Sequence, residues 1–94
     1  MRIQVEFRGF HERNPVVYET LVRLAREAKR KGHNKIGIAM LWERMRWELT
    51  IELPNHKAGD FKLNNNYRSR YARLIMQCEP DLADMFDIRA LGQE

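Results

Sequence analysis

The chain has 94 residues, of which 44% are hydrophobic and 32% charged, and its formal net charge is +4. These values predict one folded domain, 1–94, and favour a globular protein over a disordered one. The single cysteine excludes an intramolecular disulfide, and no apolar run approaches the ~18 residues of a membrane span, so we expect a cytoplasmic protein that does not bind membranes.

The first predicted element is a short strand at residues 2–7. Apolar and polar side chains alternate through RIQVEF, which is the period of a half-buried strand. Arg8-Gly9 is expected to end it.

A helix is predicted from Pro15 to about residue 31. Asn14 is a suitable N-cap, Pro15 suits the first helical position and Gly32 suits the position after the last turn. Its apolar stripe is expected to comprise Val17, Leu21, Leu24, Ala25 and Ala28.

A second helix is predicted at about 38–49, with Ile38, Leu41, Trp42, Met45 and Leu49 on its buried side. Trp47 falls off this stripe, which leaves it packed on another element or exposed. Residues 50–63 contain short β-type runs around Pro54 and Gly59, which predict a small hairpin or a loop.

A third helix is predicted to start within Asn64-Asn65-Asn66 and to end before Pro80. Its apolar stripe is Tyr67, Tyr71, Leu74, Ile75 and Cys78, so we expect Cys78 to be a core residue. Pro80 then opens a short helix whose Leu82, Met85 and Phe86 face inward.

The opposite face of the third helix contains no acidic residue. Asn66, Arg70, Arg73 and Gln77 recur there at three- and four-residue steps, with Arg68 and Ser69 beside them. Arginine, asparagine and glutamine pair with base edges, and arginine and serine also bind phosphates. This pattern favours a nucleic-acid-reading helix, although a merely solvated helix face would have the same residues.

Further basic residues could contact a phosphate backbone, namely Lys62 and the cluster Arg26, Lys29, Arg30 and Lys31. The charge is unevenly distributed, because residues 1–78 contain 16 basic and 8 acidic residues whereas residues 79–94 contain one basic and five acidic residues. A basic body favours polyanionic partners. The acidic tail could cover part of that surface or stay solvated.

Together these elements predict an α+β, mainly helical fold. It would be a three-helix helix-turn-helix or winged-helix-like domain with a short N-terminal strand and a small β-type loop between helices two and three. We expect a sequence-reading or architectural protein that binds double-stranded DNA. The alternative is a phage-encoded protein-interaction module that acts on a host protein without binding DNA. A homodimer would suit a short reading helix, but no dimer seam is visible in the sequence.

The sequence predicts no enzyme, no cofactor and no metal site. It has no H-x-x-x-H, C-x-x-C or Walker motif, and Ser69, the only serine, has no neighbouring histidine. His11 and Glu12 are the strongest remaining pair for acid–base or metal chemistry.

The run FKLNNNYRSRYARLIM, together with FHERNPVVYE before and in the first helix and MRWE in the second, resembles a group of small, uncharacterised phage and prophage proteins. The resemblance spans most of residues 7–91, and NNNY followed by RYAR is its most specific part. It implies a protein of a bacterial host or a phage-infected cell, and it implies no functional residue.

Overall fold

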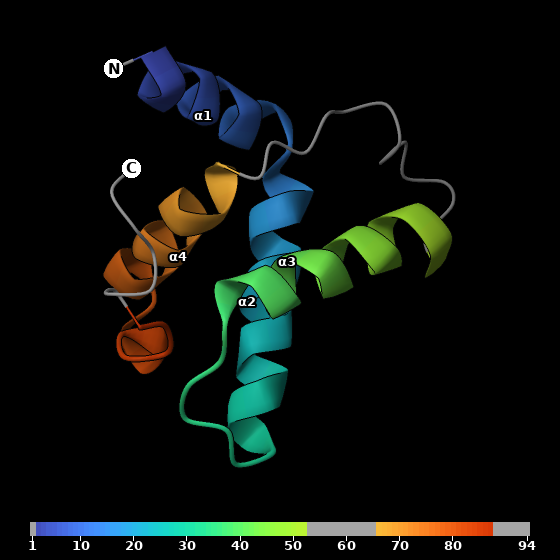
Figure 1. Ribbon diagram of the computed structural model, residues 1–94, viewed down its shortest axis with the longest axis vertical. Coiled ribbons are helices and arrows are strands. Elements are labelled where there is room, and N and C mark those ends of the chain that lie inside the picture. Colours follow the sequence, from blue (N-terminus) through green and yellow to red (C-terminus); the bar gives the residue numbers. More distant parts are fainter. Residues whose placement is uncertain (1, 53–65, 88–94) are drawn as a thin grey trace.

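A computed structural model describes residues 2–52 and 66–87, and in these ranges the chain is mainly helical. Its four α-helices are α1 (Arg2–Arg13), α2 (Pro15–Arg30), α3 (Ile38–Trp47) and α4 (Tyr67–Cys78). A π-helical turn, η1 (Glu48–Glu52), extends α3, and a short 3-10 helix, η3 (Pro80–Leu82), follows α4. The other three α-helices all contact α2, and α3 crosses it (Figure 1).

The predicted N-terminal strand is wrong, because residues 2–13 form α1. Phe7 and Phe10 lie one helical turn apart and are both buried, whereas Val5 is 73% exposed. A strand here would need a partner for its backbone hydrogen bonds, and residues 2–52 and 66–87 contain no strand. A helix satisfies its own backbone while it buries both phenylalanines. Gly9, expected to end the element, lies inside the helix.

The prediction for α2 is confirmed. Its apolar stripe is buried at Val17, Leu21, Leu24 and Ala25 and partly buried at Ala28. Gly32 has a positive φ of 98°, and the backbone N–H groups of Gly32 and His33 donate to the carbonyls of Lys29 and Ala28. These two bonds form the glycine-dependent helix end expected from the sequence.

Asn14 occupies the N-cap position, but its side chain does not cap α2. Its Nδ2 instead donates to the carbonyl oxygen of Phe10, at 3.0 Å. The residue therefore closes the end of α1 and turns the chain into α2.

The second predicted helix is also confirmed, as α3 and the start of η1. Leu41, Trp42, Met45 and Leu49 are buried, and Trp47 is 54% exposed. Residues 50–52 belong to η1 and are not the β-type run that we expected. The rest of the predicted β-type loop, residues 53–63, lies outside the described ranges.

The third predicted helix is α4, which begins at Tyr67 after Asn66 and ends before Pro80. Tyr67, Tyr71 and Ile75 are buried, and Leu74 is partly buried. Cys78 is exposed, so its prediction as a core residue is wrong. It is the last residue of α4.

The segment after α4 folds back onto the helices, as predicted. Leu82, Met85 and Phe86 are buried, and the backbone N–H of Ile36 donates to the carbonyl oxygen of Met85 at 3.1 Å. The loop between α2 and α3 is thereby joined to the chain that follows η3. Among the described residues, no helix is long and apolar enough to cross a membrane.

The helical conformation of residues 2–13 predicts effects of mutation on stability that a strand would not. Phe7→Ala should lower the free energy of unfolding by about 3 to 5 kcal/mol, because Phe7 is 6% exposed and contacts the rings of Tyr67 and Tyr71. Val5→Ala should change it by less than about 0.5 kcal/mol. Urea denaturation would measure both, and equal losses at the two sites would contradict α1, because a strand places residues 5 and 7 on one face.

Candidate nucleic-acid interface

The four residues predicted to form one row on the third helix do share one side of α4. Tyr67, Tyr71 and Ile75 turn one side of the helix into the core. The residues spaced between them, Asn66, Arg70, Arg73 and Gln77, are exposed or only partly buried. The row therefore lies on the side of α4 that faces away from the core, with Arg70 and Arg73 half-buried, and it contains no carboxylate.

Arg68 and Ser69 do not belong to this row. Ser69 is 5% exposed, and its expected place on the outer face is wrong. Each helical residue turns by about 100°, so Arg68 points to the side opposite the row and Ser69 points to one flank. Arg68 is partly buried. A phosphate could reach the Ser69 hydroxyl only after rearrangement of the helix packing.

Within the predicted basic cluster at residues 26–31, the structure distinguishes Arg26 from Lys29, Arg30 and Lys31. Arg26 is bound by two carboxylates of the segment that follows α4: its Nη2 lies 2.7 Å from Glu79 Oε1, and its Nε lies 2.9 Å from Asp81 Oδ2. The hydrogen bond from Arg26 to Asp81 lowers the pKa of Asp81. Arg26 is therefore already neutralised within the chain.

Lys29, Arg30 and Lys31 begin a run of exposed residues that continues to Lys35. Lys29 and Lys35 donate to backbone carbonyls, those of Asp81 and Asp84, and Lys31 forms a long ion pair of 3.4 Å with Glu27. The end of α2 and the turn after it thus present cations to solvent. Lys62, the remaining predicted phosphate contact, lies outside the described residues.

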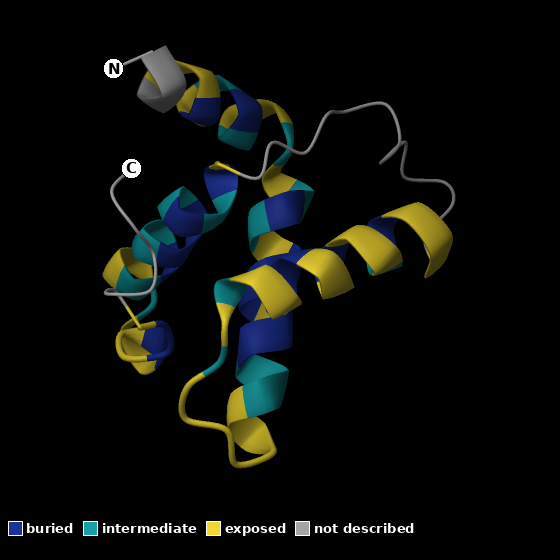
Figure 2. Ribbon diagram, in the orientation of Figure 1, coloured by how far each residue is buried: buried dark blue, intermediate teal, exposed yellow. Residues whose placement is uncertain are grey.

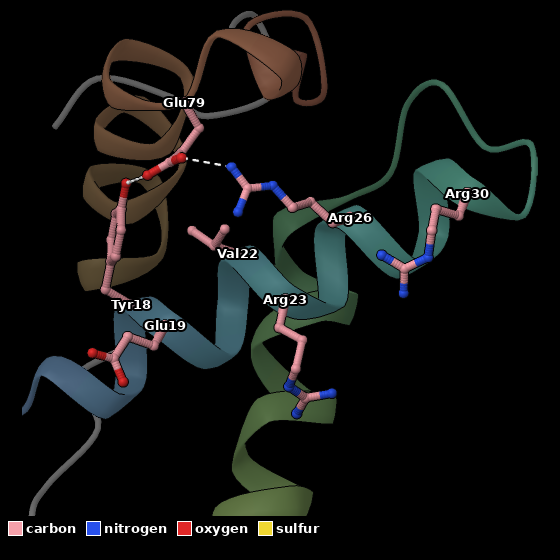
Figure 3. Close-up of a pocket in the computed structure, with 7 residues that line it drawn as sticks. All are labelled: Tyr18, Glu19, Val22, Arg23, Arg26, Arg30 and Glu79. Atoms are coloured by element: carbon pink, nitrogen blue, oxygen red, sulfur yellow. Dashed lines mark hydrogen bonds and ion pairs between the residues drawn. The ribbon is translucent and has the colours of Figure 1, made fainter.

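A groove of about 370 Å³ runs along α2 beside the Arg26 ion pairs. Tyr18 donates to Glu79 Oε2 at 2.7 Å, and burial together with this hydrogen bond raises the pKa of Tyr18. Figure 3 shows Arg26 and Tyr18 reaching Glu79, whereas Arg23 and Arg30 point elsewhere. Both Glu19 and Glu79 line the groove, so its charge is mixed and does not select an anion.

Arg23 forms an ion pair with a residue that is distant in the sequence. Its guanidinium pairs with Glu48 of η1, 25 residues along the chain. This ion pair joins α2 to the end of α3. Glu19 and Glu27 lie four residues from Arg23 on α2, but the described ion pair of Arg23 is with Glu48.

His11, one member of the expected acid–base pair, lies within a cluster of aromatic rings. It stacks on Phe7 with a centroid distance of 6.0 Å, and its Nδ1 lies 3.4 Å from the Tyr71 hydroxyl. Glu12, its neighbour, is exposed. Within the described ranges, no group of three or more His, Cys, Asp or Glu side chains could hold a metal ion.

Sequence reasoning missed the roles of Glu79, Asp81 and Lys35. The acidic composition after residue 78 was a signal that this segment could cover basic surface. The choice of Arg26 as its partner depends on residues 53 to 55 positions apart, which no local pattern reveals.

Comparisons with protein-family models, with curated proteins and with solved structures find no match to the chain. The resemblance to phage and prophage proteins therefore stays an expectation.

The Arg26–Asp81 ion pair predicts a specific loss of stability in acid. Because the folded-state pKa of Asp81 lies below the unfolded value of about 3.9, the pair stabilises the fold above that value and is lost as the pH falls through the folded pKa. Asp81→Asn should therefore flatten the decline of melting temperature below about pH 5.

Asp84→Asn is the matched control, because only the backbone carbonyl of Asp84 takes part in a described hydrogen bond. It should keep the acid dependence of the parent. Thermal melts across the acidic range would test this. Parallel curves for the parent and Asp81→Asn would show that the ion pair does not stabilise the fold.

Proposed function

We propose that this protein binds double-stranded DNA, with α4 as the helix that contacts the bases. The observation that supports the proposal is the acid-free row of Asn66, Arg70, Arg73 and Gln77 on the side of α4 that faces away from the core. Arginine pairs with the O6 and N7 atoms of guanine through two hydrogen bonds, and asparagine and glutamine pair with adenine in the same way. A 12-residue helix is about 18 Å long and fits the major groove.

In this proposal, Lys29, Arg30 and Lys31 contact the phosphate backbone from the end of α2. Their exposure supports this role, and Lys35 in the following turn joins them. Arg26 is left out, because Glu79 and Asp81 already bind it. The finer fold assignment that accompanies the proposal is a helix-turn-helix variant in which α4 is the reading helix. DNA binding would place the protein in the cytoplasm of a bacterial host or a phage-infected cell.

Replacing both arginines of the row tests the proposal. Arg70→Ala with Arg73→Ala should weaken binding to the preferred DNA by about 1 to 3 kcal/mol per arginine. The dependence of log affinity on log salt should change little, because base contacts release few counterions. Titration at fixed salt would measure the loss.

The control is Arg8→Ala with Arg13→Ala, which removes the same charge from two exposed sites on α1. It should bind within about threefold of the parent if the effect is specific to α4. Equal affinities of the parent and the α4 double variant, both still folded by circular dichroism, would eliminate α4 as the reading helix.

A second candidate function is a protein-interaction module that acts on a host protein without binding DNA. The exposed Trp47 on α3 favours it, because tryptophan and arginine dominate binding hot spots. Retention on bulk DNA separates the two functions. A DNA-binding protein elutes at a salt concentration that falls when Lys29 and Arg30 are replaced by alanine, whereas an interaction module passes through at physiological salt.

A further inference from the structure

The outer side of α3 and η1 carries an exposed apolar stripe. Met40, Trp47 and Ile51 are 63%, 54% and 55% exposed, and with Val5 they are the exposed large hydrophobic residues of the described chain. Their spacing, with Arg44 between them, follows one helix face opposite the buried Trp42 and Met45. Figure 2 shows this side of α3 exposed along its length.

A hollow of about 350 Å³ lies between α2 and α3 at one end of the stripe. Met40 and Arg44 belong to both features. The floor and walls are largely apolar and include Leu24, Ala28, Ile36 and Leu41, and Glu27, Lys31 and His33 also line the hollow. The surface thus offers both projecting apolar side chains and a recess that could receive one.

The charges around the stripe balance. Its four exposed charged residues are Glu43, Arg44, Arg46 and Glu52, and they pair within the segment: Arg44 with Glu52 at 3.3 Å and Arg46 with Glu43 at 3.1 Å. The chain as a whole has a net charge of +4. A polyanion would gain no net attraction on this face, and a second copy of the face would meet no net repulsion.

We propose that α3 and η1 pair with the same segment of a second copy, antiparallel about a twofold axis. In a twofold interface each residue contacts its counterpart reciprocally. The antiparallel register places Met40 opposite Ile51 of the partner subunit, and Arg44 opposite Trp47 of the partner subunit. A guanidinium over an indole ring is a favourable cation–π contact. A parallel pairing would instead oppose Arg44 to its own copy.

The expected dimer is of moderate strength. The 15 residues of α3 and η1 form a contact about 22 Å long, which together with the rims of the two hollows gives an interface at the small end of the specific range, roughly 1,000 Å² in total. Interfaces of this size are typical of weak, transient complexes, so the dimer should form only as the protein concentration rises. This inference does not depend on DNA binding.

Sedimentation of the full chain without DNA, over a concentration series, tests the dimer. The parent should shift from monomer to dimer. Trp47→Glu should weaken association by about thirtyfold or more, the loss expected at a hot spot. Val5→Glu, an equal change at an exposed site on α1, should associate like the parent. A parent that stays monomeric throughout, or a Trp47→Glu variant that associates equally well, would overturn the proposal.

Disulfide trapping tests the register. In a Cys78→Ser background, Met40→Cys mixed with Ile51→Cys should give a cross-linked heterodimer under mild oxidation. Met40→Cys alone should cross-link much less, because eleven helical residues separate the two copies of position 40 by about 16 Å along the axis, beyond disulfide reach. Efficient cross-linking of Met40→Cys alone would contradict the antiparallel pairing. Because neither experiment includes DNA, their failure would leave the DNA-binding proposal untouched.

Discussion

The burial of Tyr71 is the constraint on which the arrangement of the helices depends. Its ring is fully buried and lies near at least one ring from each of the other helices, among them Phe7 of α1 at 4.8 Å, Tyr18 of α2 at 6.5 Å and Trp42 of α3 at 5.9 Å between centroids. Burial raises the pKa of Tyr71, so the phenol stays neutral, and its oxygen lies 3.4 Å from His11 Nδ1. These contacts set the rotation of α4 and so decide which of its side chains face outward.

Electrostatic contacts then secure the side of the molecule opposite α1. Arg26 of α2 binds Glu79 and Asp81, Lys29 donates to the Asp81 carbonyl, and Lys35 donates to the Asp84 carbonyl. They hold the segment that follows α4 against α2 and the α2–α3 turn. The pairs are partly exposed, so each adds little to stability by itself, and their larger effect is on surface charge. Arg26 of the basic cluster is paired with carboxylates of the chain itself, whereas Lys29, Arg30 and Lys31 remain exposed.

Two chemically different surfaces result. The row on α4 and the end of α2 are rich in cations and amides, which suits a polyanion. The outer face of α3 is apolar with balanced charge, which suits another protein surface. The base-contacting row lies on α4 and the apolar stripe on α3, which would allow a small domain to dimerise and bind a second partner at once. A short reading helix gains from such pairing, since two copies contact twice as many base pairs.

The sequence alone was sufficient to locate α2, α3 and α4, because each has a clear apolar stripe and a stop signal such as Gly32 or Pro80. It also identified the row at Asn66, Arg70, Arg73 and Gln77, because helical spacing is a local property. It failed at residues 2–7, where period-two alternation was outweighed by the burial of Phe7 and Phe10 against α4. It likewise placed Ser69 outside and Cys78 inside, since a stripe predicts a direction but not where the neighbouring helices end. The pairing of Arg26 with Glu79 and Asp81, and the exposure of Trp47, were decided only by the tertiary structure. Both depend on which distant elements pack together, and no local pattern of residues encodes that choice.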